Sequence, residues 1–329
     1  IIEAHRDELP FSDQLPSFDP PKHTDHRALM MRLLTPNRLR ANEEFMWRYA
    51  DELLDPILDR GECEFITAYA APFTLVVIAD LEGVPESDRG MFTARLTRAH
   101  EDLAHKPLEF LYEAFAGYIA DRRREPRDDV MTAMATATFP DGTTPTVQDV
   151  ALLAANLFSG GQETTVRLLS FALRLLAERP DVQELLRKDR DRIPNFVEEV
   201  LRYESPLRAQ FRMARRRVTI GDVDLPAGAT MMLLPGAANR DPRQFADPAV
   251  FDVDRDNAKL HVAFGHGVHH CAGSHLARAE ARVTLNRLFD RTSDIRIDES
   301  VHGPADARRY DYLPTYFLRG LARLSLEFA

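Results

Sequence analysis

The residues best suited to chemistry are gathered at positions 264–273, which read Phe-Gly-His-Gly-Val-His-His-Cys-Ala-Gly. The glycines allow a tight backbone turn and the close approach of a flat ligand. Cys271 comes just before a predicted helix at residues 274–289, whose free N–H groups and dipole favour an anion such as a thiolate. A thiolate held in this way is a good axial ligand for haem iron. The stretch therefore predicts a thiolate-ligated haem site.

A cysteine taken alone is more often a small buried apolar residue, so the surroundings of Cys271 decide its interpretation. The string fits the pattern FGxGxHxCxG at Phe264, Gly265, Gly267, His269, Cys271 and Gly273. It closely resembles the haem-binding loop of cytochrome P-450, the haem-thiolate monooxygenases. The resemblance, to soluble bacterial members, implies haem b as cofactor, Cys271 as the iron ligand, and a binding loop that includes Phe264, Gly265, His269 and Gly273.

A second group of residues lies in the middle of the longest predicted helix, residues 147–179. Gly160 and Gly161 each cost about 1 kcal/mol there relative to alanine, and an isolated pair is more often a packing contact. The sequence GGQETT, however, resembles the central helix of the P-450 family. The resemblance implies that the glycines open a groove for dioxygen, with the Thr164 hydroxyl beside it. Glu163 would then be the acid that relays protons for O–O cleavage.

Glu199 and Arg202 are three residues apart on a predicted helix, which is close enough to form an ion pair. Such a pair is usually a surface pair worth under about 1 kcal/mol. Here it resembles the ExxR motif of the P-450 family, which an arginine from a following irregular segment completes, and Arg255 fits that position. The implied role is to lock the structure behind the haem.

Haem carries two propionates, and buried anions require cationic or hydrogen-bonding partners. Candidates occur at four separated positions that follow the order of the family motifs, namely His23, Arg27, Arg212 and His269. Each alone would more often be ordinary surface charge. Together they are expected to bind the propionates.

The remaining patterns predict a mainly α fold with minor β, which agrees with the P-450 fold of a long central helix over the haem and small peripheral sheets. Further helices are expected at residues 38–58, 110–124 and 195–203, and a short apolar element at 73–81. Thr146 and Asp149 form a plausible capping box before the long helix. A small hairpin or sheet is expected at 217–232, an irregular meander at 239–257 and a strand at 316–328.

The composition excludes several classes of protein. A formal charge of −10 argues against nonspecific nucleic-acid binding. Two cysteines far apart argue against a disulfide framework and suit a reducing cytoplasm. No apolar run approaches the roughly eighteen residues of a membrane helix, so no membrane segment is visible.

Residues 1–329 are expected to form a single domain that lacks part of the family fold. The chain opens with isoleucine, and only residues 1–18 precede the motif Asp-Pro-Pro-Lys-His. Relative to the family, an N-terminal segment and part of the roof of the substrate pocket, between about residues 90 and 110, are expected to be missing.

The expected function is a bacterial-type monooxygenase that hydroxylates an apolar small or mid-sized molecule with dioxygen. By resemblance, the pocket walls include Ala209, Gln210, Phe211, Leu313, Pro314 and Thr315. No dinucleotide-binding fingerprint is present, so a ferredoxin and ferredoxin reductase are implied as electron donors. They would dock on the cysteine side near Arg278 and Arg282, although both could equally be solvated helix residues.

Two alternatives remain open, a haem-thiolate peroxygenase and a non-catalytic haem-binding protein. The intact acid–threonine pair argues against the first, and the absence of a recognisable output domain argues against a sensor. His270 and Ala272 depart from the family pattern beside the cysteine. They are expected to tune hydrogen bonding to the sulfur or its access to solvent.

Overall fold

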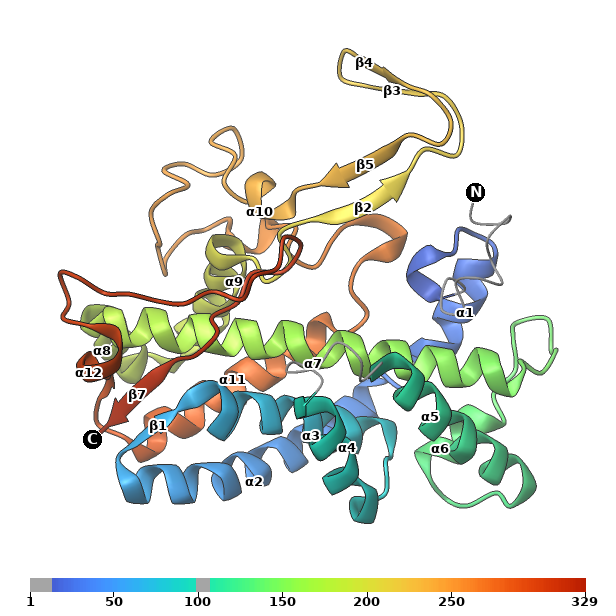
Figure 1. Ribbon diagram of the computed structural model, residues 1–329, viewed down its shortest axis with the longest axis horizontal. Coiled ribbons are helices and arrows are strands. Elements are labelled where there is room, and N and C mark those ends of the chain that lie inside the picture. Colours follow the sequence, from blue (N-terminus) through green and yellow to red (C-terminus); the bar gives the residue numbers. More distant parts are fainter. Residues whose placement is uncertain (1–13, 99–106) are drawn as a thin grey trace.

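The computed structural model describes residues 14–98 and 107–329. Its longest element, α7 (Val147–Glu178), crosses the middle of the molecule (Figure 1). The helix begins at the expected capping box. The Thr146 hydroxyl accepts a hydrogen bond from the Asp149 N–H at 3.0 Å, and the Asp149 carboxylate accepts one from the Thr146 N–H at 3.0 Å. The box satisfies two backbone donors that the first turn would otherwise leave free.

Most of the other elements are helices, which confirms the mainly α class. They are α1 (Lys22–Met31), α2 (Pro36–Arg60), α3 (Ala71–Glu82), α4 (Glu86–Arg98), α5 (Pro107–Arg124), α6 (Val130–Ala135), α8 (Pro180–Lys188), α9 (Ile193–Glu204), α10 (Pro235–Ala238), α11 (Ser274–Arg291) and α12 (Glu299–His302). The expected helices are present, and most of them are slightly longer than expected, although α7 ends one residue earlier, at Glu178. For example, α9 starts before Pro194, because proline fits the first turn of a helix.

The core packs against α7. In Figure 1, α2, α3 and α11 lie on one side of α7, and α9 with the β2–β5 sheet lies on the other. Helix α3 is buried along almost its whole length, and Tyr69, just before it, stacks on Phe73 with ring centroids 5.1 Å apart. Phe92, Phe115 and Phe158 form a second buried aromatic cluster between α4, α5 and α7. Helix α7 is therefore held on several faces, which fixes the side chains at its centre.

Three small antiparallel sheets complete the described part of the chain. One has the order β1 (Glu62–Glu64), β7 (Ser325–Phe328), β6 (Ile295–Ile297). The second pairs β2 (Gln210–Met213) with β5 (Thr230–Leu233), so that Arg212 lies opposite Met231. The third is the hairpin of β3 (Val218–Ile220) and β4 (Val223–Leu225), which projects from the body (Figure 1).

The strands differ from the sequence expectation in two places. Residues 217–232 do contain a hairpin, but β5 pairs with β2, which the sequence pattern did not predict as a strand. Of residues 316–328, only β7 is a strand, because Arg319 turns to pair with Glu204 at 2.6 Å and Tyr316 points to solvent. Residues 239–257 are irregular throughout, as expected.

Part of the expected roof region lies outside the described residues, since α4 ends at Arg98 and α5 begins at Pro107. The expectation about an N-terminal segment likewise concerns residues that the structure does not describe. Over the two described ranges, no helix is both long and apolar enough to cross a membrane.

Candidate active site

A cavity of about 430 Å³ lies between α1, α7, the segment 206–212, the loop 263–273 and the start of α11. Much of its lining is apolar and includes Met30, Leu157, Leu168, Leu201, Leu207 and Leu276. Its size falls within the usual range for small-molecule sites. The polar groups at its edge therefore determine what it can bind.

Cys271 opens into this cavity from the loop that precedes α11. Gly265 and Gly267 both have φ of 73°, a left-handed conformation that lets the loop turn tightly. The Cys271 N–H donates to the carbonyl of Phe264 at 2.8 Å, which fixes the backbone behind the sulfur. Burial raises the pKa of the Cys271 thiol, while the Gly273 N–H and the charges of Arg27 and Arg278 oppose this rise.

The two glycines of α7 have different surroundings. Both glycines line the cavity. A Cβ on Gly160 would have no described heavy atom within 4 Å, whereas a Cβ on Gly161 would lie 3.3 Å from Ile78 Cδ1. The open-groove interpretation therefore suits both positions, and Gly161 in addition packs closely against Ile78. Thr164 also lines the cavity, and its hydroxyl donates to the Gly160 carbonyl at 2.8 Å.

Glu163 lies outside the cavity lining. Its carboxylate accepts a hydrogen bond from Arg167 Nη2 at 2.8 Å, and its side chain is 39% exposed. Arg167 is buried, and a Cβ on Gly320 would collide with its guanidinium. The carboxylate of Glu163 is thus directed toward Arg167, away from the cavity that Thr164 lines.

The four residues expected to bind propionates meet at this cavity. His23, Arg27, Arg212 and His269 all line it, and the rings of His23 and His269 are 4.3 Å apart. Burial, together with the charge of Arg27 and the neighbouring His269, lowers the pKa of His23. Burial and the charge of Arg212 lower the pKa of His269.

His23 is the clearest sign that this end of the cavity accepts a polar ligand. The residue is buried, yet neither ring nitrogen has a hydrogen-bond partner among the described residues. Arg27 donates to the His270 carbonyl at 2.8 Å, and Arg212 donates to the Phe211 carbonyl at 2.7 Å, so both retain further donors. A thiol on one wall, a glycine on α7, and several donors at the edge fit a flat apolar group with anionic substituents, such as haem.

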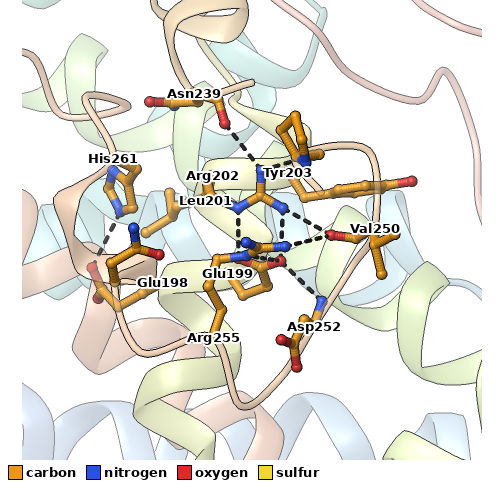
Figure 2. A network of polar contacts seen from close by, with 12 residues as sticks. Glu198, Glu199, Leu201, Arg202, Tyr203, Asn239, Val250, Asp252, Arg255 and His261 are labelled. Atoms are coloured by element: carbon orange, nitrogen blue, oxygen red, sulfur yellow. Dashed lines mark hydrogen bonds and ion pairs between the residues drawn. The ribbon is translucent and has the colours of Figure 1, made fainter. Parts of the chain in front are cut away.

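Behind the cavity, Glu199 and Arg202 form a fully buried ion pair with distances of 2.6 Å and 2.7 Å. Arg255 joins from the meander, with its Nε donating to Glu199 at 3.2 Å, and the Asp252 N–H donates to the same carboxylate at 2.9 Å (Figure 2). The structure thus brings together the three residues that the sequence grouped.

The two arginines of this network also hold the backbone of the meander. Arg202 donates to the carbonyls of Asn239, Pro248 and Val250 at 2.9–3.0 Å, and Figure 2 labels the first and last of these acceptors. Arg255 donates to the Ala246 carbonyl at 2.6 Å. A segment without helix or strand is ordered in this way, because its carbonyls find buried cationic donors.

Only some of the remaining expected site residues line the cavity. Phe264, Gly273 and Gln210 line the cavity, whereas Gly265, Ala209, Phe211, Leu313, Pro314 and Thr315 are not part of its lining. Phe211 is about half exposed. The departures beside the cysteine also differ, since Ala272 lines the cavity and His270 is exposed.

Several cavity residues were not predicted from the sequence. They include Leu15, Pro16, Met30, Asn156 and Leu276. Asn156 could have been found from the sequence, because it shares a face of α7 with Gly160, Thr164 and Leu168, which follow it at a spacing of four. No comparable local signal marks Leu15 or Pro16.

Comparison with known proteins agrees with this geometry. The family model described as Cytochrome P450 matches residues 85–293. The chain belongs to the cytochrome P450 family. The curated relative Cytochrome P450 144 of Mycobacterium tuberculosis is 36% identical over 325 residues, covering 95% of this chain and 72% of the relative. The 6-deoxyerythronolide B hydroxylase of Saccharopolyspora erythraea is 35% identical over 288 residues, covering 85% and 71%.

Among solved structures, the substrate-free form of Mycobacterium marinum cytochrome P450 CYP150A6 superposes with a TM-score of 0.94 at 54% identity. The match covers 100% of this chain and 79% of that one. The P450 fold expected from the sequence is therefore confirmed, and the chain is an oxidoreductase of the P450 monooxygenase class with bacterial relatives.

Proposed function

We propose that this cytochrome P450 binds haem b through Cys271 and hydroxylates an apolar small or mid-sized organic substrate, using dioxygen. The observation that carries the proposal is the placement of Cys271, Gly160 and Thr164 around one cavity whose polar edge holds His23, with both ring nitrogens lacking a described protein partner. This one cavity therefore supplies the iron ligand, the groove for dioxygen and the donors for the propionates.

The residues of the polar edge would hold the haem. His23, Arg27, Arg212 and His269 supply donors for the propionates, and Cys271 supplies the thiolate for the iron. Phe264, Gly265 and Gly273 shape the loop that presents the sulfur. When bound, the haem supplies the activation of dioxygen and the transfer of one oxygen atom to the substrate.

Thr164 and Glu163 have different roles in proton transfer. The Thr164 hydroxyl lines the cavity and donates to Gly160, so it can release this hydrogen bond to donate into the cavity. The Glu163 carboxylate is part-exposed and reaches solvent, so it takes up protons there and passes them toward Thr164 after turning from Arg167. Glu199, Arg202 and Arg255 act only by holding the structure behind the haem.

The substrate class follows from the apolar walls of the cavity. Leu157, Leu168 and Leu207 exclude water and orient an apolar molecule, which favours its hydroxylation over competing reactions. One relative is named for the hydroxylation of 6-deoxyerythronolide B, which supports a hydroxylase reaction here. Ala209–Phe211 and 313–315 would contribute to the walls around a bound substrate.

Electrons would come from a ferredoxin and its reductase, in the cytoplasm, with docking on the Cys271 side. Arg278 and Arg282 lie there on α11, but each is paired with a carboxylate, Glu198 and Glu43 respectively. Both arginines keep about a third of their side chains exposed, so they offer donors but little net charge. Residues 1–329 are proposed to act as a single haem domain.

The deciding experiment is the absorption spectrum of the reduced protein with carbon monoxide, measured beside Cys271→Ser. A strongly red-shifted Soret band in the parent that is lost in the variant supports thiolate ligation by Cys271. An unshifted band in the parent, or the absence of haem, contradicts the proposal.

Turnover then separates the alternatives. Product formed with ferredoxin, reductase and dioxygen supports the monooxygenase, whereas product formed only with added peroxide identifies a peroxygenase. Haem binding without any change of spin state or turnover across a substrate library identifies a non-catalytic haem protein.

A further inference from the structure

A second carboxylate on α9 connects this helix to the cysteine loop. Glu198 is adjacent to Glu199, and neighbouring helical positions point about 100° apart, so Glu198 faces the loop and α11 instead of the meander. Its two oxygens accept from Nε and Nη2 of Arg278 at 2.5 Å and 2.9 Å. Such two-point contacts between arginine and carboxylate are among the strongest ion pairs in proteins.

His261 completes this cluster. The Ala263 N–H donates to Nδ1 of His261 at 3.1 Å, so Nδ1 carries no proton and the neutral ring has its proton on Nε2. Nε2 donates to Glu198 at 3.2 Å (Figure 2). Glu198 thus receives donors from both α11 and the segment that leads into the cysteine loop.

The same cluster touches the residue that holds the cysteine backbone. The Arg278 guanidinium lies 4.6 Å from the centroid of the Phe264 ring, and the Phe264 carbonyl accepts from the Cys271 N–H. Glu198 therefore controls both the position and the net charge of a cation that lies against the residue bonded to the Cys271 backbone.

The charge of Glu198 persists through the neutral range of pH. Burial opposes its ionisation, but hydrogen bonds from Arg278 and His261 outweigh burial and lower the pKa of Glu198 to about 2. Only 12% of the Glu198 side chain is exposed, so solvent screens the pair incompletely.

We propose that Glu198, acting through Arg278, sets the reduction equilibrium of the haem iron at Cys271, as a positioning residue that does not touch the reacting atoms. This inference rests on the proposed haem-thiolate function. One-electron reduction adds a negative charge at the iron and its thiolate. A cation near the sulfur favours the reduced form, and a carboxylate that neutralises the cation disfavours it.

The test is the midpoint potential of the haem-loaded protein, measured by spectroelectrochemistry. Glu198→Gln leaves the charge of Arg278 uncompensated, so the reduction equilibrium constant is expected to rise at least about threefold, or about 30 mV for one electron. Arg278→Gln removes the cation and leaves Glu198 with His261 as its remaining partner, so a fall of similar size is expected. Glu198→Asp keeps the charge and is expected to restore most of the parent potential.

Glu43→Gln is the matched control, because it breaks the 2.7 Å pair of Glu43 with Arg282, one turn further along α11. No shift is expected there. Shifts of the same sign in Glu198→Gln and Arg278→Gln, or no shift in either, would show that the cluster is only structural and overturn the inference. A parent protein without the thiolate-type carbon monoxide spectrum overturns the proposed function itself, and this inference with it.

Discussion

Two polar regions of this cytochrome P450 are both rich in cationic residues but differ in how completely they are paired. In the network behind the cavity, every charged group of Glu199, Arg202 and Arg255 has partners inside the protein. At the edge of the cavity, both nitrogens of buried His23 lack a partner among the described residues, and Arg27 and Arg212 bond only to backbone carbonyls or a nearby amide.

This difference separates a structural network from a binding site. Leaving a buried polar group unsatisfied costs free energy, so a ligand that supplies the missing partners of His23 would bind favourably. The paired region stabilises the chain by itself. The open region gains its stability only on binding, as expected for residues that hold a prosthetic group.

The largest effect should come from breaking the paired region. Glu199→Ala leaves Arg202 and Arg255 as buried, uncompensated cations, so we expect a loss of about 3–5 kcal/mol in the free energy of unfolding. That is a large share of the stability of a typical domain. Urea unfolding measures the loss. Glu184→Gln is the control, because its pair with Lys188 is exposed, and it should leave the urea midpoint unchanged.

A second buried carboxyl sharpens the comparison, because Glu82 is as buried as Glu199 but has no hydrogen-bond partner in the described part of the chain. Burial raises the pKa of Glu82 well above its ordinary value. The folded protein therefore keeps a proton that the unfolded chain releases, and stability present at low pH is lost as pH rises.

Because burial raises the folded-state pKa of Glu82, the loss is expected to grow by about 1.4 kcal/mol per pH unit between the ordinary and the raised pKa. Glu82→Gln should thus match the parent near pH 4.5 and exceed its stability increasingly toward pH 7. Urea unfolding across this range tests it. Glu280, whose pKa burial also raises, remains in both proteins and leaves a residual slope. Parallel profiles would show that Glu82 does not carry this proton.

Changing the open region should affect haem more than folding. His23→Leu removes a proposed propionate donor, so we expect haem affinity to fall about tenfold to a hundredfold. Urea unfolding of the haem-free protein should be unchanged or slightly favourable, because an unsatisfied imidazole is removed. Haem transfer to an excess of a haem-scavenging protein measures the affinity. His275 is exposed, so His275→Leu is the control and should bind haem as the parent does. A haem-free His23→Leu protein with a lower urea midpoint than the parent would show that His23 stabilises the fold itself.

The smallest effect concerns the paired glycines of α7. Gly160→Ala should stabilise the helix by about 1 kcal/mol, because its Cβ enters open space, but should weaken carbon monoxide binding by narrowing the cavity. Gly161→Ala should gain less, since Ile78 must move. Thermal unfolding and carbon monoxide titration of the two variants test this. A Gly160→Ala protein that binds carbon monoxide as tightly as the parent would mean that Gly160 does not border the ligand groove.

Much of the site was predictable because its motifs are local. The spacing of Gly265, Gly267 and Cys271 specified a tight loop before a helix, and the spacing of Thr146 and Asp149 specified a helix start. These patterns depend on backbone geometry over a few residues, which the chain encodes wherever the rest of it lies. The same holds for Glu199 and Arg202, which are three apart on one helix.

The tertiary structure alone decided which way several of these residues face. Glu198 meets Arg278 across 80 positions of sequence, and the Arg27 side chain reaches the His270 carbonyl across 243. Glu163 points to Arg167 because Gly320, on a distant loop, leaves room for the guanidinium. Local spacing specifies which residues can meet on one element. Contacts between elements, and the burial that gives a charge its effect, exist only after α7, α9 and α11 have packed together.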